Sequence, residues 1–304
     1  MQTILGAGDV IGNELTKALA KYNTPVRLVA RNPKTVMGNE ELFSADLMDA
    51  EATLKAVEGS SVVYLTIGLQ YNRDIWRKMW PQIMQNVIKA CHLHQANLVF
   101  FDNIYCYHPE GFSDIREDHP KKPVSEKGKV RHAILEMLWQ AHKAGEIKAT
   151  VARSADFYGP NAGAVSVLNE GVLKPLKANK RANWFGGAHY KHSFTYTIDA
   201  AKATAMLGNS EIAWGEEWHL PTAKNALTGQ EFVEKLAALT GAKPKMQVAG
   251  PFLLSLVGLF VPIMKEFKEM LYQYDRDYIF NSDKFEAAFE FNPTSYDEGL
   301  KSLI

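Results

Sequence analysis

Short apolar runs alternate with segments of helical spacing through the first half of the chain, and this alternation constrains the fold more than any other feature. The strand-like runs lie at residues 2–8, 24–31, 61–68, 96–103 and 147–159. Segments in which apolar residues recur with a helical period separate them. Parallel strands need such helical crossovers, so the pattern predicts an α/β fold, a doubly wound parallel sheet with helices on both faces.

The alternation becomes irregular after Pro160, where helical spacing is left at residues 198–208 and 229–241. We expect residues 1–159 to form a dinucleotide-binding Rossmann domain and residues 160–304 a smaller C-terminal substrate-binding lobe, with 193–208 returning to the Rossmann part. The apolar run at 252–264 is shorter than the roughly 20 residues that span a bilayer, and it contains Pro262. It predicts a core or interface helix, either a pocket lid or the face of a homodimer.

Charge and cysteine content exclude several classes of partner. The 304 residues include 34 Lys and Arg against 34 Asp and Glu, so the net positive field that attracts nucleic acid is missing. Two cysteines are too few for a disulfide framework, and no leader-like segment precedes the first strand. These features predict a cytoplasmic protein with a small-molecule substrate and neither a nucleic-acid nor a membrane partner.

A glycine-rich turn, "LGAGDVIGNEL", joins the first strand to the first helix. Gly6, Gly8 and Gly12 permit a tight turn whose backbone N–H groups can approach a pyrophosphate at a helix N-terminus. The alternative is a simple strand-to-helix turn. Arg31, at the end of the second strand, suits the 2′-phosphate of NADP, although NAD remains open, and the alternative role of Arg31 is a solvated strand end.

Six motifs together resemble a known family. The glycine loop, "ADLMD", "SVVYLTIG", "LVFFDNIYCYHP", "ARSADFYGP" and "HSFTYTIDAAKA" occur in the order typical of extended short-chain dehydrogenases/reductases of the NAD-dependent epimerase/dehydratase type. The resemblance covers nearly the whole chain and implies an NAD(P)-dependent enzyme acting on a small or sugar-like hydroxyl or carbonyl substrate. It implies cofactor contacts from Gly6, Gly8, Asp9, Val10, Ile11, Gly12, Arg31, Asp46, Leu47, Thr66, Ile67, Gly68, Arg131 and Tyr158.

The chain departs from this family in its glycine loop. Asp9 occupies the position of the middle glycine, and a carboxylate beside a pyrophosphate should repel it. The repulsion is avoided if Asp9 turns away and caps the following helix through its N–H groups, and we expect this cap.

The catalytic helix departs further. Aligning "PVSEKGKVRHAILE" with the pattern of the family places Lys127 at the tyrosine and Arg131 at the lysine four residues later. Arg131 can donate hydrogen bonds to ribose but is effectively never deprotonated. Lys127 can act as acid or base only if its pKa falls well below the ordinary value of about 10.4. The alternative is a solvated, charged helix face.

Other polar residues follow the fifth predicted strand. The resemblance places Asn103 where the family has a Ser or Thr that polarises the substrate oxygen, and an amide cannot relay a proton. Tyr105, Tyr107 and Tyr158 follow strands of the same sheet edge, so one of them can supply the missing phenol, with ordinary loop packing as the alternative. His192 stands where nucleotide-sugar members carry a phosphate-binding arginine.

Two hypotheses remain. The first is an NAD(P)-dependent oxidoreductase or epimerase whose acid and base residues have changed. The second is a non-catalytic NADP-binding redox sensor that resembles the NmrA-like branch of the superfamily. Neither requires a metal, and the "CHLH" sequence does not predict one, because residues two apart point to different faces of a helix.

Overall fold

The chain folds into two compact units, each drawn from several stretches of sequence. The computed structural model describes residues 1–250, 252 and 262–304. The segment that returns to the first unit begins at Ala200, later than the predicted 193–208, and Tyr107–Ser125 joins the second unit. The first unit comprises Met1–Cys106, Glu126–Arg153 and Ala200–Trp218, and the second comprises Tyr107–Ser125, Ser154–Asp199 and His219–Ile304.

A seven-stranded sheet forms the centre of the first unit. Its strands are β1 (Gln2–Leu5), β2 (Val26–Ala30), β3 (Glu41–Ser44), β4 (Val62–Leu65), β5 (Asn97–Asp102), β6 (Ala149–Arg153) and β11 (Glu217–His219). They lie in the order β11-β6-β5-β4-β1-β2-β3, and every pairing from β3 to β6 is parallel. This order confirms the predicted doubly wound fold.

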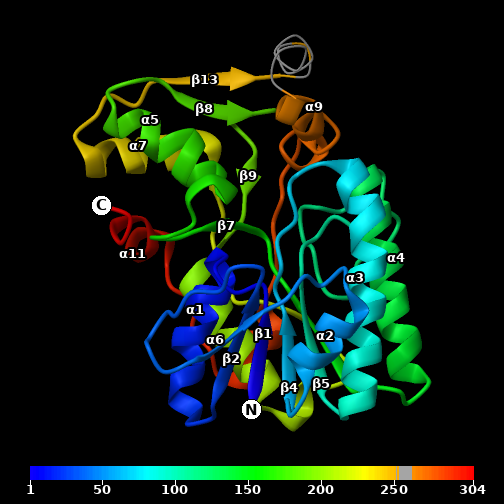
Figure 1. Ribbon diagram of the computed structural model, residues 1–304. Coiled ribbons are helices and arrows are strands. Elements are labelled where there is room, and N and C mark those ends of the chain that lie inside the picture. Colours follow the sequence, from blue (N-terminus) through cyan, green and yellow to red (C-terminus); the bar gives the residue numbers. More distant parts are fainter. Residues whose placement is uncertain (251, 253–261) are drawn as a thin grey trace. The chain divides into compact units, whose positions relative to one another are not determined.

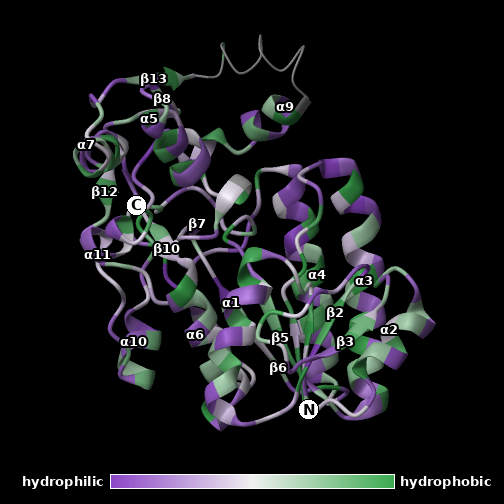
Figure 2. Cartoon of the chain, turned by 60° about the vertical axis from the view of Figure 1, so that its left-hand side comes forward, coloured by the Kyte–Doolittle hydropathy of each residue, from purple (hydrophilic) through white to green (hydrophobic). Residues whose placement is uncertain are grey.

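Helices cover both faces of this sheet, as the alternation of periods predicts (Figure 1). Helices α2 (Ala50–Val57), α3 (Arg73–His94) and α4 (Glu126–Lys143) lie on one face, and α1 (Val10–Leu19) and α6 (Thr197–Gly208) lie on the other. All residues of β1 and β4 are buried, which requires two covered faces. Figure 2 shows the corresponding hydrophobic colouring along the central strands.

Side-chain caps fix where two of these helices begin. The Asp49 carboxylate accepts hydrogen bonds from the backbone N–H groups of the second and third residues of α2, and the Asn72 side chain does the same for α3. Such caps satisfy donors that have no partner within the helix. The start of α3 matters for the site, because Trp76 and Trp80 of this helix lie against the guanidinium of Arg131 on α4.

In its described residues, the second unit contains three two-stranded sheets and several short helices. The strand pairs are β7 (Asp156–Tyr158) with β10 (Phe194–Tyr196), β8 (Ala182–Phe185) with β13 (Met246–Ala249), and β9 (Lys191–His192) with β12 (Leu227–Thr228). A π-helical segment, Val167–Leu173, leads into α5 (Lys174–Lys177), and α7 (Gly229–Thr240), α9 (Pro262–Lys268), α10 (Asp283–Phe289) and α11 (Tyr296–Lys301) follow.

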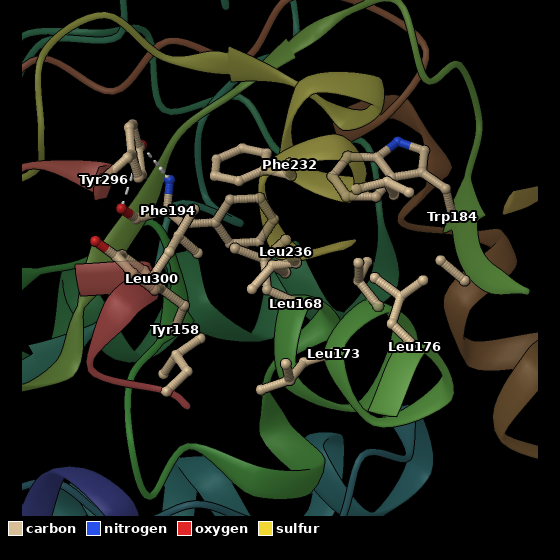
Figure 3. Close-up of a cluster of buried hydrophobic side chains, with 14 of the residues drawn as sticks. Tyr158, Leu168, Leu173, Leu176, Trp184, Phe194, Phe232, Leu236, Tyr296 and Leu300 are labelled. Atoms are coloured by element: carbon tan, nitrogen blue, oxygen red, sulfur yellow. Dashed lines mark hydrogen bonds between the residues drawn. The ribbon is translucent and has the colours of Figure 1, made fainter. Parts of the chain in front are cut away.

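An aromatic cluster forms the core of the second unit (Figure 3). Trp184, Phe194, Phe232 and Tyr296 belong to this cluster, together with Tyr158 and several leucines. Most of the predicted apolar helix at residues 252–264 lies outside the described residues.

Candidate functional site

The glycine loop makes a turn that only glycine can adopt at two positions. Gly6 has φ +116°, and a side chain there would meet the backbone of Ile67 at 2.5 Å. At Gly12, in the first turn of α1, an added Cβ would lie 2.6 Å from the carbonyl oxygen of Gly6. These two close approaches bring the end of β1, the end of β4 and the N-terminus of α1 together.

A cavity of about 280 Å³ lies in the first unit where strands β1, β2 and β4 end. Its size is near the lower end of the range for small-molecule sites. Seven of the residues predicted to bind a cofactor line it, namely Gly6, Asp9, Arg31, Asp46, Leu47, Ile67 and Gly68. The other seven are not among its lining residues, although Gly8 and Gly12 belong to the same turn; they are Gly8, Val10, Ile11, Gly12, Thr66, Arg131 and Tyr158.

The cavity has features that suit a dinucleotide. Gly8 has φ +97°, and no described atom lies within 4 Å of the position where its Cβ would be, so the loop presents bare backbone. Arg31 is exposed on the wall. Leu47, another lining residue, is held in place because Asn86 of α3 donates a 2.9 Å hydrogen bond to its carbonyl oxygen. A backbone cradle with a cation beside it fits the pyrophosphate and adenosine parts of such a ligand.

The structure corrects the prediction for Asp9. This residue stands at the N-cap position of α1, but its side chain makes no capping hydrogen bond within the described part of the chain. Its Oδ2 accepts a 2.9 Å hydrogen bond from the backbone N–H of Gly68, across the cavity wall. The residue as a whole is exposed, yet partial desolvation of the carboxyl raises the pKa of Asp9, and the Gly68 hydrogen bond opposes this shift.

Lys127 and Arg131 of α4, which the resemblance predicts at catalytic positions, are both buried. Lys127 is 0% exposed and Arg131 is 3% exposed, so the alternative of a solvated helix face is wrong for this pair. The guanidinium of Arg131 donates a 2.6 Å hydrogen bond to Oδ1 of Asp102 and lies over the rings of Trp80 and Phe100, 4.3 and 4.7 Å from their centroids. The aromatic faces and the carboxylate offset the cost of burying this charge.

Asp102 also bonds a second guanidinium. Its Oδ2 accepts a 2.7 Å hydrogen bond from Arg153, whose other terminal nitrogen donates at 2.7 Å to Glu217. The indole N–H of Trp139 completes the group with a 3.0 Å bond to Glu217. The negative charges of Asp102 and Glu217 thus balance the positive charges of Arg131 and Arg153. The predicted roles of Arg131 in ribose binding and catalysis stay predictions, and the contacts to Asp102 commit much of its hydrogen-bonding capacity.

The turn after β5 presents Tyr105. The side-chain oxygen of Asn103 accepts a 3.0 Å hydrogen bond from the backbone N–H of Tyr105, and the N–H of Asn103 bonds in turn to Asp102. The Tyr105 ring stacks on Trp76 of α3, with ring centroids 6.1 Å apart. Its hydroxyl lies 3.4 Å from that of Tyr71, which follows the end of β4. Asn103 and Tyr105 are both partly exposed.

The other phenols that the sequence offers are buried in the second unit. Tyr107 is 0% exposed and its hydroxyl lies 2.8 Å from Nε2 of His219. Tyr158 lies in the aromatic core (Figure 3), and burial raises its pKa far above the ordinary value. Among the three candidate tyrosines, Tyr105 alone retains access to solvent, and the cofactor contact of Tyr158 stays a prediction.

His192, predicted at a phosphate-binding position, is buried as well. Its ring is stacked between Tyr274 and Tyr278, with centroids 4.4 and 4.3 Å away, and its Nε2 lies 3.0 Å from Oδ2 of Asp156. The hydroxyl of Tyr274 donates a 2.6 Å hydrogen bond to the same carboxylate. This cluster presents a carboxylate beside His192, which suits a bound diphosphate poorly.

Sequence reasoning missed Tyr71, Trp76 and the ion network around Asp102. Tyr71 follows the "TIG" strand end closely, and its place after a strand of the predicted sheet is the signal that could have found it. The ion network carries no comparable signal, because its members come from β5, α4, β6 and β11. In the described part of the chain, no cluster of His, Cys, Asp or Glu is arranged to hold a metal, and no helix is long and apolar enough to cross a membrane.

Comparisons with known proteins agree with this architecture. A family model described as the NAD dependent epimerase/dehydratase family matches residues 3–217. No curated protein matches the sequence. Among solved structures, UDP-glucose 4-epimerase from Thermus thermophilus in complex with NAD is 18% identical, with a TM-score of 0.80 over 100% of this chain and 97% of the other.

Two further structures are similar to the same extent. UDP-glucuronic acid 4-epimerase from Bacillus cereus in complex with NAD is 17% identical, with a TM-score of 0.80 over 99% of this chain and 97% of the other. Pal from Bacillus thuringiensis is 17% identical, with a TM-score of 0.81 over 100% and 97%. At these identities the likeness shows a shared fold.

Proposed function

The chain belongs to the NAD-dependent epimerase/dehydratase family, and from that premise we propose that it binds a nicotinamide dinucleotide and catalyses oxidation, reduction or epimerisation at a hydroxyl or carbonyl carbon of a small or sugar-like substrate. The observation that carries the proposal is the cavity at the ends of β1, β2 and β4, lined by the glycine loop and Arg31. This position in a doubly wound sheet is where such folds bind their ligands.

Residues of the first unit divide the task of binding. Backbone N–H groups of the glycine loop and the N-terminus of α1 face the pyrophosphate position, with Asp9 as an opposing charge. Arg31 binds the 2′-phosphate of NADP, while Asp46 and Leu47 border the adenine. The bound dinucleotide supplies hydride transfer, and the protein orients the reacting carbon and exchanges protons with its oxygen.

The substrate is the less defined partner. The structurally similar epimerases bind UDP-sugars, as their names state, and a sugar-like hydroxyl substrate is the class that this resemblance favours. His192 is buried and its Nε2 already lies 3.0 Å from the Asp156 carboxylate, so this side chain is committed within the second unit and is not presented to a diphosphate. We therefore favour a sugar or small alcohol without a nucleotide over a UDP-sugar.

A binding titration tests the proposal. The purified protein is titrated with NADPH and with NADH, and cofactor fluorescence is recorded. We expect saturable binding of both, tighter for NADPH. Gly12→Val serves as the matched negative control, because its side chain would occupy the space between the glycine loop and α1. If neither dinucleotide binds the wild-type protein, the proposal fails. Tight binding with no turnover of any sugar or alcohol would favour the redox-sensor alternative.

A further inference from the structure

Tyr71 connects the cavity of the first unit to the altered catalytic helix. It directly follows Gln70, which lines the cavity, and Ile75 lines the same cavity one residue before Trp76. Trp76 contacts two phenol rings: it stacks on Tyr105 and meets Tyr71 edge-on, with centroids 5.8 Å apart. The N–H of its indole donates to the carbonyl of Gln70 at 3.0 Å, which fixes the tryptophan against the cavity wall.

Lys127 places a buried cation against the ring of Tyr71, one of these two phenols. Its ammonium nitrogen lies 4.5 Å from the centroid of the Tyr71 ring, and the residue is 0% exposed. A lysine without solvent access cannot itself meet a substrate in this arrangement. A cation so close to a phenol nevertheless stabilises the phenolate relative to the neutral form, and the low polarity of a buried site strengthens the effect.

The two hydroxyls face each other at 3.4 Å, and both tyrosines are partly exposed. This distance is long for a strong hydrogen bond, but catalytic hydrogen bonds often tighten only when a ligand is bound. Tyr105 is additionally held by the Asn103 turn. The arrangement thus has two partly exposed phenols whose hydroxyls face each other, and a buried cation against the ring of Tyr71.

We propose that Tyr105 and Tyr71 form a two-phenol proton relay supported by Lys127, and that this relay replaces the acid–base group missing from α4. The inference rests on the proposed function. Tyr105 is the catalytic residue that meets the substrate oxygen, and Tyr71 and Lys127 are positioning residues that act through it.

The proton transfers balance in both directions. When a carbonyl oxygen gains negative charge during reduction by a nicotinamide dinucleotide, the O–H bond of Tyr105 breaks and its proton forms the new alcohol. Tyr71 then passes its own proton to Tyr105 and becomes a phenolate beside the Lys127 ammonium, until solvent restores the proton. In the oxidative direction, the Tyr71 phenolate accepts the proton of Tyr105, which in turn deprotonates the substrate hydroxyl.

The first test is spectroscopic and needs neither cofactor nor substrate. The absorbance of tyrosinate is followed as the pH is raised. We expect one phenol to ionise before the other partly exposed tyrosines in the wild type, and Tyr71→Phe to remove this early transition. Lys127→Met should move it to higher pH. Tyr64, Tyr158 and Tyr296 do not interfere, because burial raises their pKa values far above the ordinary value.

A matched control exists in the same unit. Lys21 lies 5.0 Å from the centroid of the Tyr22 ring, a similar cation–π contact at a site outside the cavity lining. Partial burial raises the pKa of Tyr22, so Tyr22→Phe should leave the early transition in place. An early transition that persists in both Tyr71→Phe and Tyr105→Phe would overturn the relay.

The second test measures turnover after dinucleotide binding is established. Tyr105→Phe should lower kcat by about 100-fold or more, the usual contribution of a general acid, with unchanged dinucleotide affinity. Tyr71→Phe should lower kcat by about 10-fold and shift the pH profile, which loss of packing alone would not do. Unchanged pH profiles in Tyr71→Phe and Lys127→Met would overturn the relay. Failure of the wild-type protein to bind a dinucleotide would overturn the proposed function. The tyrosinate titration would still show whether Tyr71, Tyr105 and Lys127 are coupled, because it needs no dinucleotide.

Discussion

Replacing Asp102 with Asn tests whether the buried ion network holds the first unit together. The side chains of Asp102 and Arg153 are 0% exposed and that of Arg131 is 3% exposed, so solvent cannot compensate a lost charge. Asp102→Asn keeps the shape of the side chain but leaves two guanidinium groups with Glu217 as the remaining carboxylate of the network. Breaking a buried ion pair in this way costs about 3–5 kcal/mol.

This free-energy loss converts to a measurable shift in urea. With a denaturant slope of about 3 kcal/mol per M, the unfolding midpoint should fall by about 1–2 M. Because the chain has two compact units, circular dichroism should be combined with hydrogen exchange of peptides from β5 and α4, which report on the first unit.

An exposed ion pair on α2 provides the control. Glu51 and Lys55 form a 2.8 Å pair with side chains that are 76% and 62% exposed, so Glu51→Gln should leave the midpoint unchanged within error. The reasoning is refuted if Asp102→Asn shifts the midpoint no further than Glu51→Gln does. That result would mean that Arg131 is not held by Asp102 and is available for a ligand.

Three further predictions concern the cavity. Arg31→Ala should weaken binding of NADPH while sparing NADH in fluorescence titrations, and an equal loss for both would exclude a 2′-phosphate contact. The pKa of Asp9 is already raised, and a bound pyrophosphate would raise it further, so wild-type binding should take up a proton and weaken as the pH rises through that pKa. Asp9→Asn should tighten binding by about 2- to 5-fold and flatten this pH dependence in calorimetric titrations at several pH values, and a slope that persists would assign the proton to another group. Gly12→Ala should lower the melting temperature, because its Cβ would clash with the carbonyl oxygen of Gly6 at a cost of about 1–3 kcal/mol. Gly250→Ala is the control and should not lower it, because no described atom lies within 4 Å of its added Cβ. Equal melting temperatures of the two variants would show that the glycine loop relaxes freely.

The strands and the glycine loop could be predicted because their signals are local. Buried parallel strands are continuous apolar runs, and the turn after β1 needs glycine for steric reasons that the sequence displays directly. Strand β3 and strand β11 escaped prediction because they are short and lie at the edges of the sheet. Local pattern says little about such strands, since pairing with a neighbour defines them.

The site could be predicted less completely, because the direction and environment of a side chain depend on distant residues. Asp9 is at the predicted N-cap position, but the backbone N–H of Gly68 attracts its carboxylate away from α1. The spacing of Lys127 and Arg131 correctly places both on one face of a helix. Whether that face meets water or aromatic rings depends on α3 and β5, which no property of the α4 sequence reveals.

The predicted replacement of the family's Tyr and Lys by Lys127 and Arg131 on α4 bears on how charge and proton transfer are distributed among the residues of the site. It adds a positive charge to a buried face, and the structure offsets this charge with Asp102, Glu217 and the rings of Tyr71, Trp80 and Phe100. The helix then supplies charge, while the accessible phenols come from the loops after β4 and β5. Mutations on α4 should therefore alter stability and proton transfer more than dinucleotide affinity, which depends on the loops after β1, β2 and β4.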